Sequence, residues 1–348
     1  MKLTINGREV EAIRGQTLLE ICEAQGIRVP TLCHDSRLKP EGACRLCVVE
    51  NKKRGNLVTA CSTLAQEGME IETDSPKVYN SRKMNLDLLF SNHPNDCLTC
   101  GASGACKLQD YCYEYDVIDG SFRNGVRKTA PIDTTNRYYD YDPDKCILCG
   151  KCYRICNEVQ CSDAIGLSER GFDTKVVAPM DAGLINSRCV SCGNCVAVCP
   201  TGALLPKGQN FRYFEVKRTR STCSYCGVGC QIDVLTRGKD IVGVEPHFGK
   251  KANDGLLCVK GRFSWHFVQH RDRLKTPLIK ENGTFREAGW DEALDLIASK
   301  MKTVKEESGP DAIAGFSSAR CTNEENYLFQ KLLRAGVGTN NIDHCARL

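Results

Sequence analysis

Cysteine is the residue type of this sequence with the greatest capacity for chemistry. The chain has 24 cysteines among its 348 residues, far more than an ordinary globular protein uses for packing. Fifteen of them are separated from another cysteine by only two or three residues. Thiols at these spacings hold metals or form disulfides, and metal binding is the better explanation in a reducing compartment.

The first set of cysteines has the spacing C-x10-C-x2-C-x13-C. Two irons bridged by two sulfides need four thiolates, and a long loop between them lets backbone N–H groups hydrogen-bond to the sulfur atoms. A zinc knot is the alternative, although the set lacks paired C-x2-C knuckles. We therefore expect a [2Fe-2S] cluster with the ligands Cys33, Cys44, Cys47 and Cys61.

The second set contains a histidine, in the pattern H-x3-C-x2-C-x5-C after a predicted helix end. A histidine so close to a C-x2-C pair is placed as a ligand. Imidazole in place of a thiolate would make a [4Fe-4S] cluster less negative and raise its potential. Zinc held by three cysteines and one histidine remains open on spacing alone. The predicted ligands are His93, Cys97, Cys100 and Cys106.

The third and fourth sets both read C-x2-C-x2-C-x3-C, and a proline follows the second run. This is the pattern of bacterial two-cluster ferredoxins, in which the fourth cysteine of each run ligates the other cluster. Zinc sites use pairs of cysteines rather than triplets. We therefore assign one [4Fe-4S] cluster to Cys146, Cys149, Cys152 and Cys199, and the other to Cys189, Cys192, Cys195 and Cys156.

The fifth set has the spacing C-x2-C-x3-C-x27-C. Zinc is again an alternative, but the position downstream of two ferredoxin clusters favours a fourth [4Fe-4S] cluster. Its predicted ligands are Cys223, Cys226, Cys230 and Cys258. The remaining cysteines are expected to be structural, as small buried hydrophobic residues often are. They are Cys22, Cys112, Cys161, Cys321 and Cys345. Cys161 leaves some doubt, because it lies close to a ferredoxin helix.

Other features limit the location and the partners of the chain. There is no leader at Met1, no twin-arginine signal and no apolar run near the ~18 residues that a membrane span needs, so we expect a cytoplasmic protein without a span. The 47 basic and 43 acidic residues nearly balance, which argues against nucleic acid. No GxGxxG or Walker loop is present, so any nicotinamide or flavin must bind another subunit.

The elements that must position these ligands begin with a small mixed domain. Asn6-Gly7 between two short apolar runs is a strong hairpin signal, and residues 17–25 form a short predicted helix. Residues 56–63 and 69–75 alternate as strands do. Hairpin, helix and returning strands are typical of a β-grasp ferredoxin.

Two predicted helices carry capping signals. Thr17 and Glu20 have the spacing of a capping box at the first helix. Ser75-Pro76 starts a second helix that runs to about Asn92, because proline is tolerated at the first helical position.

The later segments predict a repeat and then an α/β domain. Residues 138–206 contain two cysteine-rich passes that repeat one small cluster-binding unit, and a hairpin is expected to turn near Gly238. An amphipathic helix over 291–304, a strand over 311–316 and a helix over 323–336 follow. We expect the strand to lack a partner, because it stands alone between two helices.

The predicted fold class is therefore α+β and multidomain. We expect a [2Fe-2S] β-grasp ferredoxin domain at 1–78, a one-histidine-three-cysteine domain at 79–120, a two-[4Fe-4S] ferredoxin domain at 138–208, a further [4Fe-4S] domain at 217–275 and the start of an α/β domain at 276–348.

The order of the first four sets resembles two families that share this front end. These are the large iron–sulfur subunit of NADH dehydrogenases and the related [FeFe] hydrogenases. The resemblance covers about residues 1–208 and does not decide the active site. The hydrogenase interpretation weakens after Pro206, because that family continues to its own catalytic-cluster cysteines rather than to CSYCGVGC.

From Cys223 the sequence instead resembles molybdopterin oxidoreductases, through CSYCGVGC and CVKGR. The resemblance implies a cubane beside a bis-molybdopterin guanine dinucleotide that holds molybdenum or tungsten. Lys260 matches the lysine that lies between cluster and pterin in that family. SARCTNEENYLFQKLLRAGVGTNNIDHCARL is similar to the segment of formate dehydrogenases that leads to the molybdenum ligand, a selenocysteine or cysteine expected immediately after Leu348.

The resemblance implies a function for the full protein. Formate would be oxidised to carbon dioxide, or the reverse, and electrons would pass Lys260 and the Cys223 cluster, cross the ferredoxin cubanes and leave by the His93 and Cys33 clusters. Partner subunits with flavin and NAD, or ferredoxin, would accept them. We expect the 348 residues alone to lack the catalytic ligand, and the codon after Leu348 to be a UGA meant as selenocysteine.

Two rival interpretations remain. A non-catalytic relay subunit of an NADH dehydrogenase or hydrogenase complex would contain clusters but no molybdenum or pterin. A zinc-stabilised scaffold would be colourless and would lack acid-labile sulfide.

Overall fold

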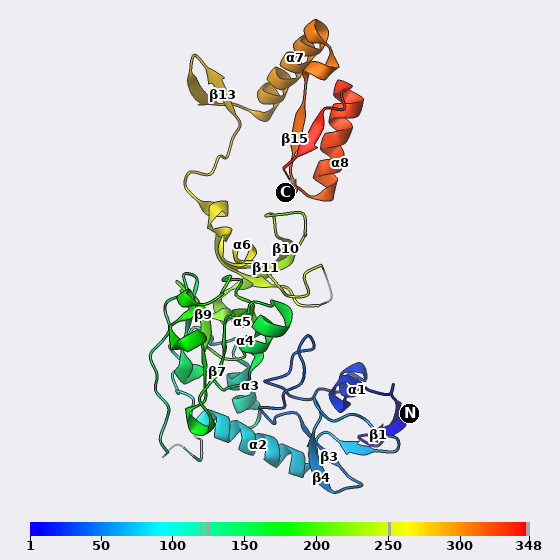
Figure 1. Cartoon of the computed structure of the whole chain (residues 1–348), viewed down its shortest axis with the longest axis vertical. Helices are drawn as coiled ribbons and strands as arrows, with labels where there is room; N and C mark the ends of the chain where they lie inside the picture. The colour runs from blue at the N-terminus through cyan, green and yellow to red at the C-terminus, as the bar shows by residue number, and fades with distance from the viewer. Residues whose placement is uncertain (119, 123–124, 250–251, 346–348) are drawn as a thin grey trace. The chain divides into compact units, whose positions relative to one another are not determined.

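The computed structural model describes residues 1–118, 120–122, 125–249 and 252–345, and Figure 1 shows its elements. The chain forms two compact units, Met1–Val216 and Lys217–Leu348. None of the helices in the described ranges combines the length and the apolar character needed to cross a membrane.

The first unit opens with a five-stranded sheet in the order β2-β1-β5-β3-β4. β1 pairs antiparallel with β2 and parallel with β5, and β3 pairs antiparallel with β4 and β5. Asn6 and Gly7 have φ of 50° and 77°, the left-handed values of a tight hairpin turn. The predicted hairpin is confirmed, whereas β3 was not predicted. The strands are β1 Lys2–Ile5, β2 Arg8–Glu11, β3 Val48–Asn51, β4 Asn56–Thr59 and β5 Glu70–Glu72.

Helix α1, Leu18–Ala24, packs on this sheet. Its capping box is confirmed, because Thr17 Oγ1 accepts from the Glu20 N–H and the Glu20 carboxylate accepts from the Thr17 N–H at 2.7 Å. Cys22 lies on its buried face and is fully shielded from solvent, as expected for a small apolar residue. Burial raises the pKa of the Cys22 thiol to about 11.

Two further helices stand before and after the second set of predicted ligands in the sequence. Helix α2, Pro76–Ser91, begins at Ser75, whose hydroxyl accepts from the Val78 N–H, as predicted. Helix α3, Lys107–Glu114, follows (Figure 1). The buried Arg82 on α2 donates to the Val48 carbonyl at 2.8 Å and so ties the helix to β3.

The dicluster region is built from short elements around the cysteine runs. The two cysteine runs each contain one short helix at the same position in the run. A glycine with a left-handed backbone precedes each helix, Gly150 in the first run and Gly193 in the second. The predicted repeat is therefore visible in the backbone. The elements are β6 Tyr139–Tyr141 paired with β9 Leu204–Pro206, β7 Gly166–Ser168 paired with β8 Lys175–Val177, and helices α4 Lys151–Arg154 and α5 Asn194–Val198. Short turns of other helix types lie at Pro143–Lys145, Ile155–Val159, Gly171–Asp173, Pro179–Asp181, Leu184–Asn186 and Tyr213–Glu215.

The second unit begins with the antiparallel sheet β10-β11-β12. Gly238, with φ of 63°, turns the predicted hairpin between β11 and β12. β10 was not predicted, because its side chains are all exposed and show no apolar alternation. The elements of this part are β10 Lys217–Thr222, β11 Gln231–Arg237, β12 Asp240–Pro246, α6 Val259–Phe263 and the turn Trp265–Gln269.

The last segment corrects one expectation. β15 is not unpaired, because it pairs in parallel with β16, which lies in the stretch expected to precede a metal ligand. Helix α8 packs on this pair, since Gly315 lies against Phe329 and Leu333. The elements are the hairpin β13 Leu278–Glu281 and β14 Thr284–Glu287, α7 Trp290–Ser308, the turn Pro310–Ala312, β15 Gly315–Ser317, α8 Asn323–Lys331 with the π-helical turn Leu332–Val337, and β16 Ile342–His344 (Figure 1).

Removing the Thr17 cap should destabilise the first unit. We expect Thr17→Ala to lower the free energy of unfolding by about 1 kcal/mol, because an amide at the start of α1 loses its acceptor. The urea midpoint of the purified chain measures this. Glu20→Gln is the matched control, because glutamine can still complete a capping box and should cost less. Equal midpoints for Thr17→Ala and the unaltered chain would contradict the prediction.

Candidate iron–sulfur centres

The structure brings the four cysteines of the first set together in a buried place. Cys33, Cys44, Cys47 and Cys61 are each at most 6% exposed. A hydrogen bond with Cys44 lowers the pKa of the Cys33 thiol to about 5 and raises that of Cys44, and Cys47 and Cys61 form a second such pair. The four thiols thus interact with one another, and four neighbouring thiols are a donor set suited to a thiolate-bound metal cluster.

The second set gathers around the ends of α2 and α3. Cys106 caps the N-terminus of α3, and its thiol accepts from the Gln109 N–H at 3.5 Å. Burial and the neighbouring thiols of Cys100 and Cys97 raise the pKa of Cys106 to about 12.

The histidine of the second set has the properties of a metal ligand. His93 lies two residues after the end of α2 and is 8% exposed. Its Nδ1 is buried without a hydrogen-bond partner, and burial lowers the pKa of the imidazole to about 4. The ring is therefore neutral, which is the form that binds metals. A neutral, unpartnered imidazole is suited to ligate a metal, and its ligation together with the three cysteines stays a prediction.

The dicluster region places the fourth cysteine of each run with the other run. Burial raises the pKa of Cys152, and the thiols of Cys146, Cys149 and Cys199 add to this rise. In the second group, burial and the neighbouring thiols raise the pKa of Cys195 to about 12. That group consists of Cys195 with Cys192, Cys189 and Cys156. The groupings are those of the proposed crossed assignment, and iron ligation by them stays a prediction.

Hydrogen-bond donors reach the sulfur atoms at equivalent positions of the two runs. The Leu148 N–H donates to Cys146 Sγ and the Ser191 N–H to Cys189 Sγ, each at 3.4 Å. Leu148 and Ser191 both have left-handed backbones, with φ of 52° and 53°, and this turns their N–H groups toward sulfur. The Tyr139 hydroxyl also lies 3.2 Å from Cys189 Sγ. Such donors tune the potential of a bound cluster.

One hydrophobic core contains residues from three of the sets. Leu86 of α2 and Leu108 of α3 are almost fully buried in it. The predicted ligands in this core are Cys33, Cys44, Cys100, Cys106 and Cys149. The first set, the second set and the first run of the dicluster region are therefore packed against one another within the first unit.

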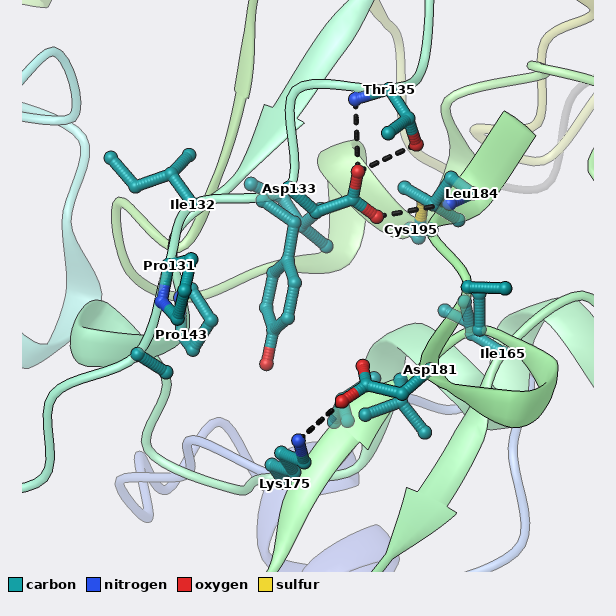
Figure 2. Close-up of a pocket in the computed structure, with 18 of the residues that line it drawn as sticks. Pro131, Ile132, Asp133, Thr135, Pro143, Ile165, Lys175, Asp181, Leu184 and Cys195 are labelled. Carbon is teal, nitrogen blue, oxygen red and sulfur yellow. Dashed lines mark hydrogen bonds and ion pairs between the residues drawn. The ribbon is translucent and has the colours of Figure 1, made fainter. Parts of the chain in front are cut away.

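A cavity lies beside the dicluster sets. Figure 2 shows its wall, in which Cys195 is one of the lining residues, and its volume is about 420 Å³. The Asp133 carboxylate accepts from the Leu184 N–H at 3.0 Å, and Lys175 pairs with Asp181 at 2.5 Å. The Asp133 carboxylate thus joins the two chain segments that form the wall near Cys195.

The fifth set lies in the second unit and is more open. The Cys223 N–H donates to the Cys230 carbonyl at 2.9 Å, while Cys226 and Cys258 are exposed. Burial raises the pKa of Cys223, and the thiols of Cys258 and Cys226 add to the rise. The structure therefore brings these four cysteines together, and Lys260 follows on α6.

The loop of the fifth set contacts the segment before α8. The Gly227 N–H donates to the Ala319 carbonyl at 2.9 Å. A Cβ on Gly227 would lie 3.2 Å from the carbonyl oxygens of Ala319 and Cys321. The stretch that resembles formate dehydrogenases thus folds directly onto the cluster loop.

In the parts of the chain that the structure describes, no three His, Cys, Asp or Glu side chains converge as ligands of a single metal ion. Of the leftover cysteines, Cys112 is buried, Cys161 and Cys345 are exposed, and Cys321 is half-buried.

The sequence did not reveal three residues that lie close to predicted ligand cysteines. A Cβ on Gly202 would lie 2.6 Å from Cys100 Sγ, and one on Gly261 would lie 3.4 Å from Cys223 Sγ. Arg154 donates to the carbonyl of Cys33 at 2.6 Å. Glycines after a cysteine run are the only signal that the sequence offered for the first two.

The fold and these sets define a multidomain chain of successive cysteine-rich segments, and comparison with protein families gives the class of each segment. Five family models match successive segments: 2Fe-2S iron-sulfur cluster binding domain at 1–76, NADH-ubiquinone oxidoreductase-G iron-sulfur binding region at 82–120, 4Fe-4S dicluster domain at 145–203, molybdopterin oxidoreductase Fe4S4 domain at 216–270 and molybdopterin oxidoreductase at 273–348. The predicted fold class is confirmed. The chain has the domain order of the N-terminal part of a molybdopterin oxidoreductase with a front end like that of NADH-ubiquinone oxidoreductase-G.

Three curated relatives align with nearly the whole chain. It is 37% identical to the probable oxidoreductase YjgC of Bacillus subtilis over 99% of this chain and 39% of that protein. It is 37% identical to the NADPH-Fe(3+) oxidoreductase subunit alpha of Geobacter sulfurreducens, over 100% of this chain and 40% of that protein. It is 32% identical to a putative formate dehydrogenase of Staphylococcus aureus, over 99% and 39%. The chain thus spans about 40% of the length of these relatives.

A solved structure resembles part of the chain. A chain of an NAD+-reducing [NiFe]-hydrogenase in the H2-reduced state matches with a TM-score of 0.57 and 29% identity. The match covers 60% of this chain and 88% of that chain.

Cys106 and Cys112 provide a matched test of the second set. Both are buried in the same core, at 8% and 7% exposure. We expect Cys106→Ala to remove one cluster and so about four irons, whereas Cys112→Ala should keep the full iron content. Iron analysis per chain measures both. An equal iron content in the two variants would contradict the ligand assignment.

Gly202 should tolerate no side chain. We expect Gly202→Ala to destabilise the first unit by about 1–3 kcal/mol, because the new methyl group overlaps Cys100 Sγ. Gly166→Ala is the control, because a Cβ placed there would meet no atom within 4 Å and the Gly166 backbone is not left-handed. Thermal unfolding compares the two, and similar melting temperatures would count against the close contact.

Proposed function

We propose that the five sets ligate one [2Fe-2S] and four [4Fe-4S] clusters and that the chain is the electron-transfer part of a formate dehydrogenase catalytic subunit. The observation that supports the first half is the crossed grouping of the dicluster cysteines, in which Cys199 lies with Cys146, Cys149 and Cys152, and Cys156 lies with Cys189, Cys192 and Cys195. The unpartnered Nδ1 of the buried His93 adds to it. When bound, these clusters supply one-electron transfer.

The residues of the chain have three tasks in this function. The cysteines hold iron as thiolates, while His93 provides a neutral ligand that makes its set less negative. Backbone N–H groups, such as that of Leu148, stabilise charge on sulfur. Lys260, two residues after Cys258, matches the lysine that lies between cluster and pterin in the molybdopterin oxidoreductases that this segment resembles, and it would supply a positive charge there.

Formate as the substrate is supported by the last segment. The stretch over 318–348 resembles formate dehydrogenases, and the Ala319 carbonyl within it accepts from the Gly227 N–H of the fifth set's loop. A relative with the printed name putative formate dehydrogenase aligns with 99% of the chain. The molybdenum or tungsten pterin and its chalcogen ligand would be supplied by the full protein.

Partners are proposed from the front end. Relatives include an NADH-quinone oxidoreductase component of Rhizobium meliloti and a chain of an NAD+-reducing hydrogenase. We propose that flavin- and NAD-binding iron–sulfur subunits, or ferredoxin, exchange electrons with the first unit in the cytoplasm.

The second candidate function is a relay subunit without its own catalysis. The names of the hydrogenase chain and of the NADH-quinone oxidoreductase relative favour it. A relay subunit would contain iron and sulfide but neither molybdenum nor tungsten. Metal analysis of the protein purified from its own organism distinguishes the two.

Formate-dependent reduction of viologen by the native complex tests the proposal. We expect activity that depends on molybdenum or tungsten, and Lys260→Met should lower it several-fold with iron content unchanged, because a cation between two redox centres is lost. Lys275→Met, at an exposed lysine of the same unit, is the control. A complex with full iron, no pterin and no response to formate would overturn the formate assignment.

A further inference from the structure

A buried arginine lies at the boundary between the first set and the dicluster region. Arg154 ends helix α4 and is 6% exposed. Its Nη2 donates to the carbonyl of Cys33 at 2.6 Å and to the carbonyl of Cys149 at 3.3 Å. Cys33 belongs to the proposed [2Fe-2S] set and Cys149 to a proposed [4Fe-4S] set, so one guanidinium group bridges ligands of two clusters.

The other donors of Arg154 fix its position. Nη1 donates to the Lys39 carbonyl at 2.6 Å, and Nε lies 3.0 Å from a carboxylate oxygen of Glu41. Glu41 also accepts from the Tyr153 hydroxyl. The planar fork of arginine can serve several acceptors at fixed angles, which a lysine ammonium cannot do.

A second group of charges lies along the same boundary. Lys151 of α4 is buried and lies 3.9 Å from Asp35, which also pairs with Arg37 at 2.8 Å. Buried charges of this kind cost free energy unless they are paired. Because these charged groups must stay paired, the pairs favour one orientation of the loop from Cys33 to Glu41 against α4.

We infer that Arg154 is a positioning residue that locks the Cys33 ligand set to the Cys149 ligand set and sets the separation across which electrons would pass. This inference rests on the proposed cluster ligation. The positive charge also acts on both sets, because a nearby cation stabilises the more negative, reduced state of a cluster.

Two substitutions of Arg154 separate the effect of its positioning from the effect of its charge. Arg154→Lys keeps the charge but cannot bridge both carbonyls. The potentials should therefore stay, while reduction of the [2Fe-2S] cluster slows because the separation between the two sets is no longer fixed. Arg154→Gln removes the charge, so both midpoint potentials should also fall.

The experiment uses the full chain with its clusters. Iron and sulfide are counted first, redox titration followed by electron paramagnetic resonance gives the potentials, and rapid-freeze samples after photoreduction give the rate of [2Fe-2S] reduction. Arg28→Lys is the matched control, because Arg28 forms an exposed pair with Glu114 at 2.7 Å without touching a proposed ligand.

The outcomes are distinct. A slower rate in Arg154→Lys with full iron supports the inference, as do lowered potentials in Arg154→Gln. Unchanged rates and potentials in both variants would overturn it, and so would loss of cluster iron from both, which would assign Arg154 to assembly. An unaltered chain without iron and sulfide would instead refute the proposed ligation itself.

Discussion

Burial of closely spaced thiols is the constraint on which the first unit depends. Burial raises the pKa of Cys152 and Cys195, and their neighbouring thiols raise it further. A metal cluster needs thiolates, so cations must replace the protons at these places. Because Cys149 lies in the core that also holds ligands of two other sets, cluster insertion and packing of the unit are expected to depend on each other.

Besides its apolar cores, the first unit has specific polar and backbone contacts that fix the geometry around the cysteines. Left-handed residues such as Leu148 and Ser191 aim N–H groups at sulfur, and Gly202 leaves room for Cys100. Arg154 and Arg82 join separate segments through backbone carbonyls. These contacts hold donor sets at fixed places, which matters because cluster potentials respond to hydrogen bonds and charge.

Local signals made much of the fold predictable. The Asn6-Gly7 turn and the Thr17 capping box need only neighbouring residues, and the spacing of the cysteines predicted the crossed grouping of the dicluster cysteines. The parallel pairing of β15 with β16 and the position of Arg154 could not be predicted, because both depend on contacts between distant segments. The exposed strand β10 lacks the apolar alternation on which strand prediction relies.

Iron and acid-labile sulfide per chain test the central claim most directly. One [2Fe-2S] and four [4Fe-4S] clusters predict a brown protein with about eighteen irons and as many sulfides. A colourless protein that contains zinc and no acid-labile sulfide would contradict the account, because the donor sets would then hold single ions rather than clusters.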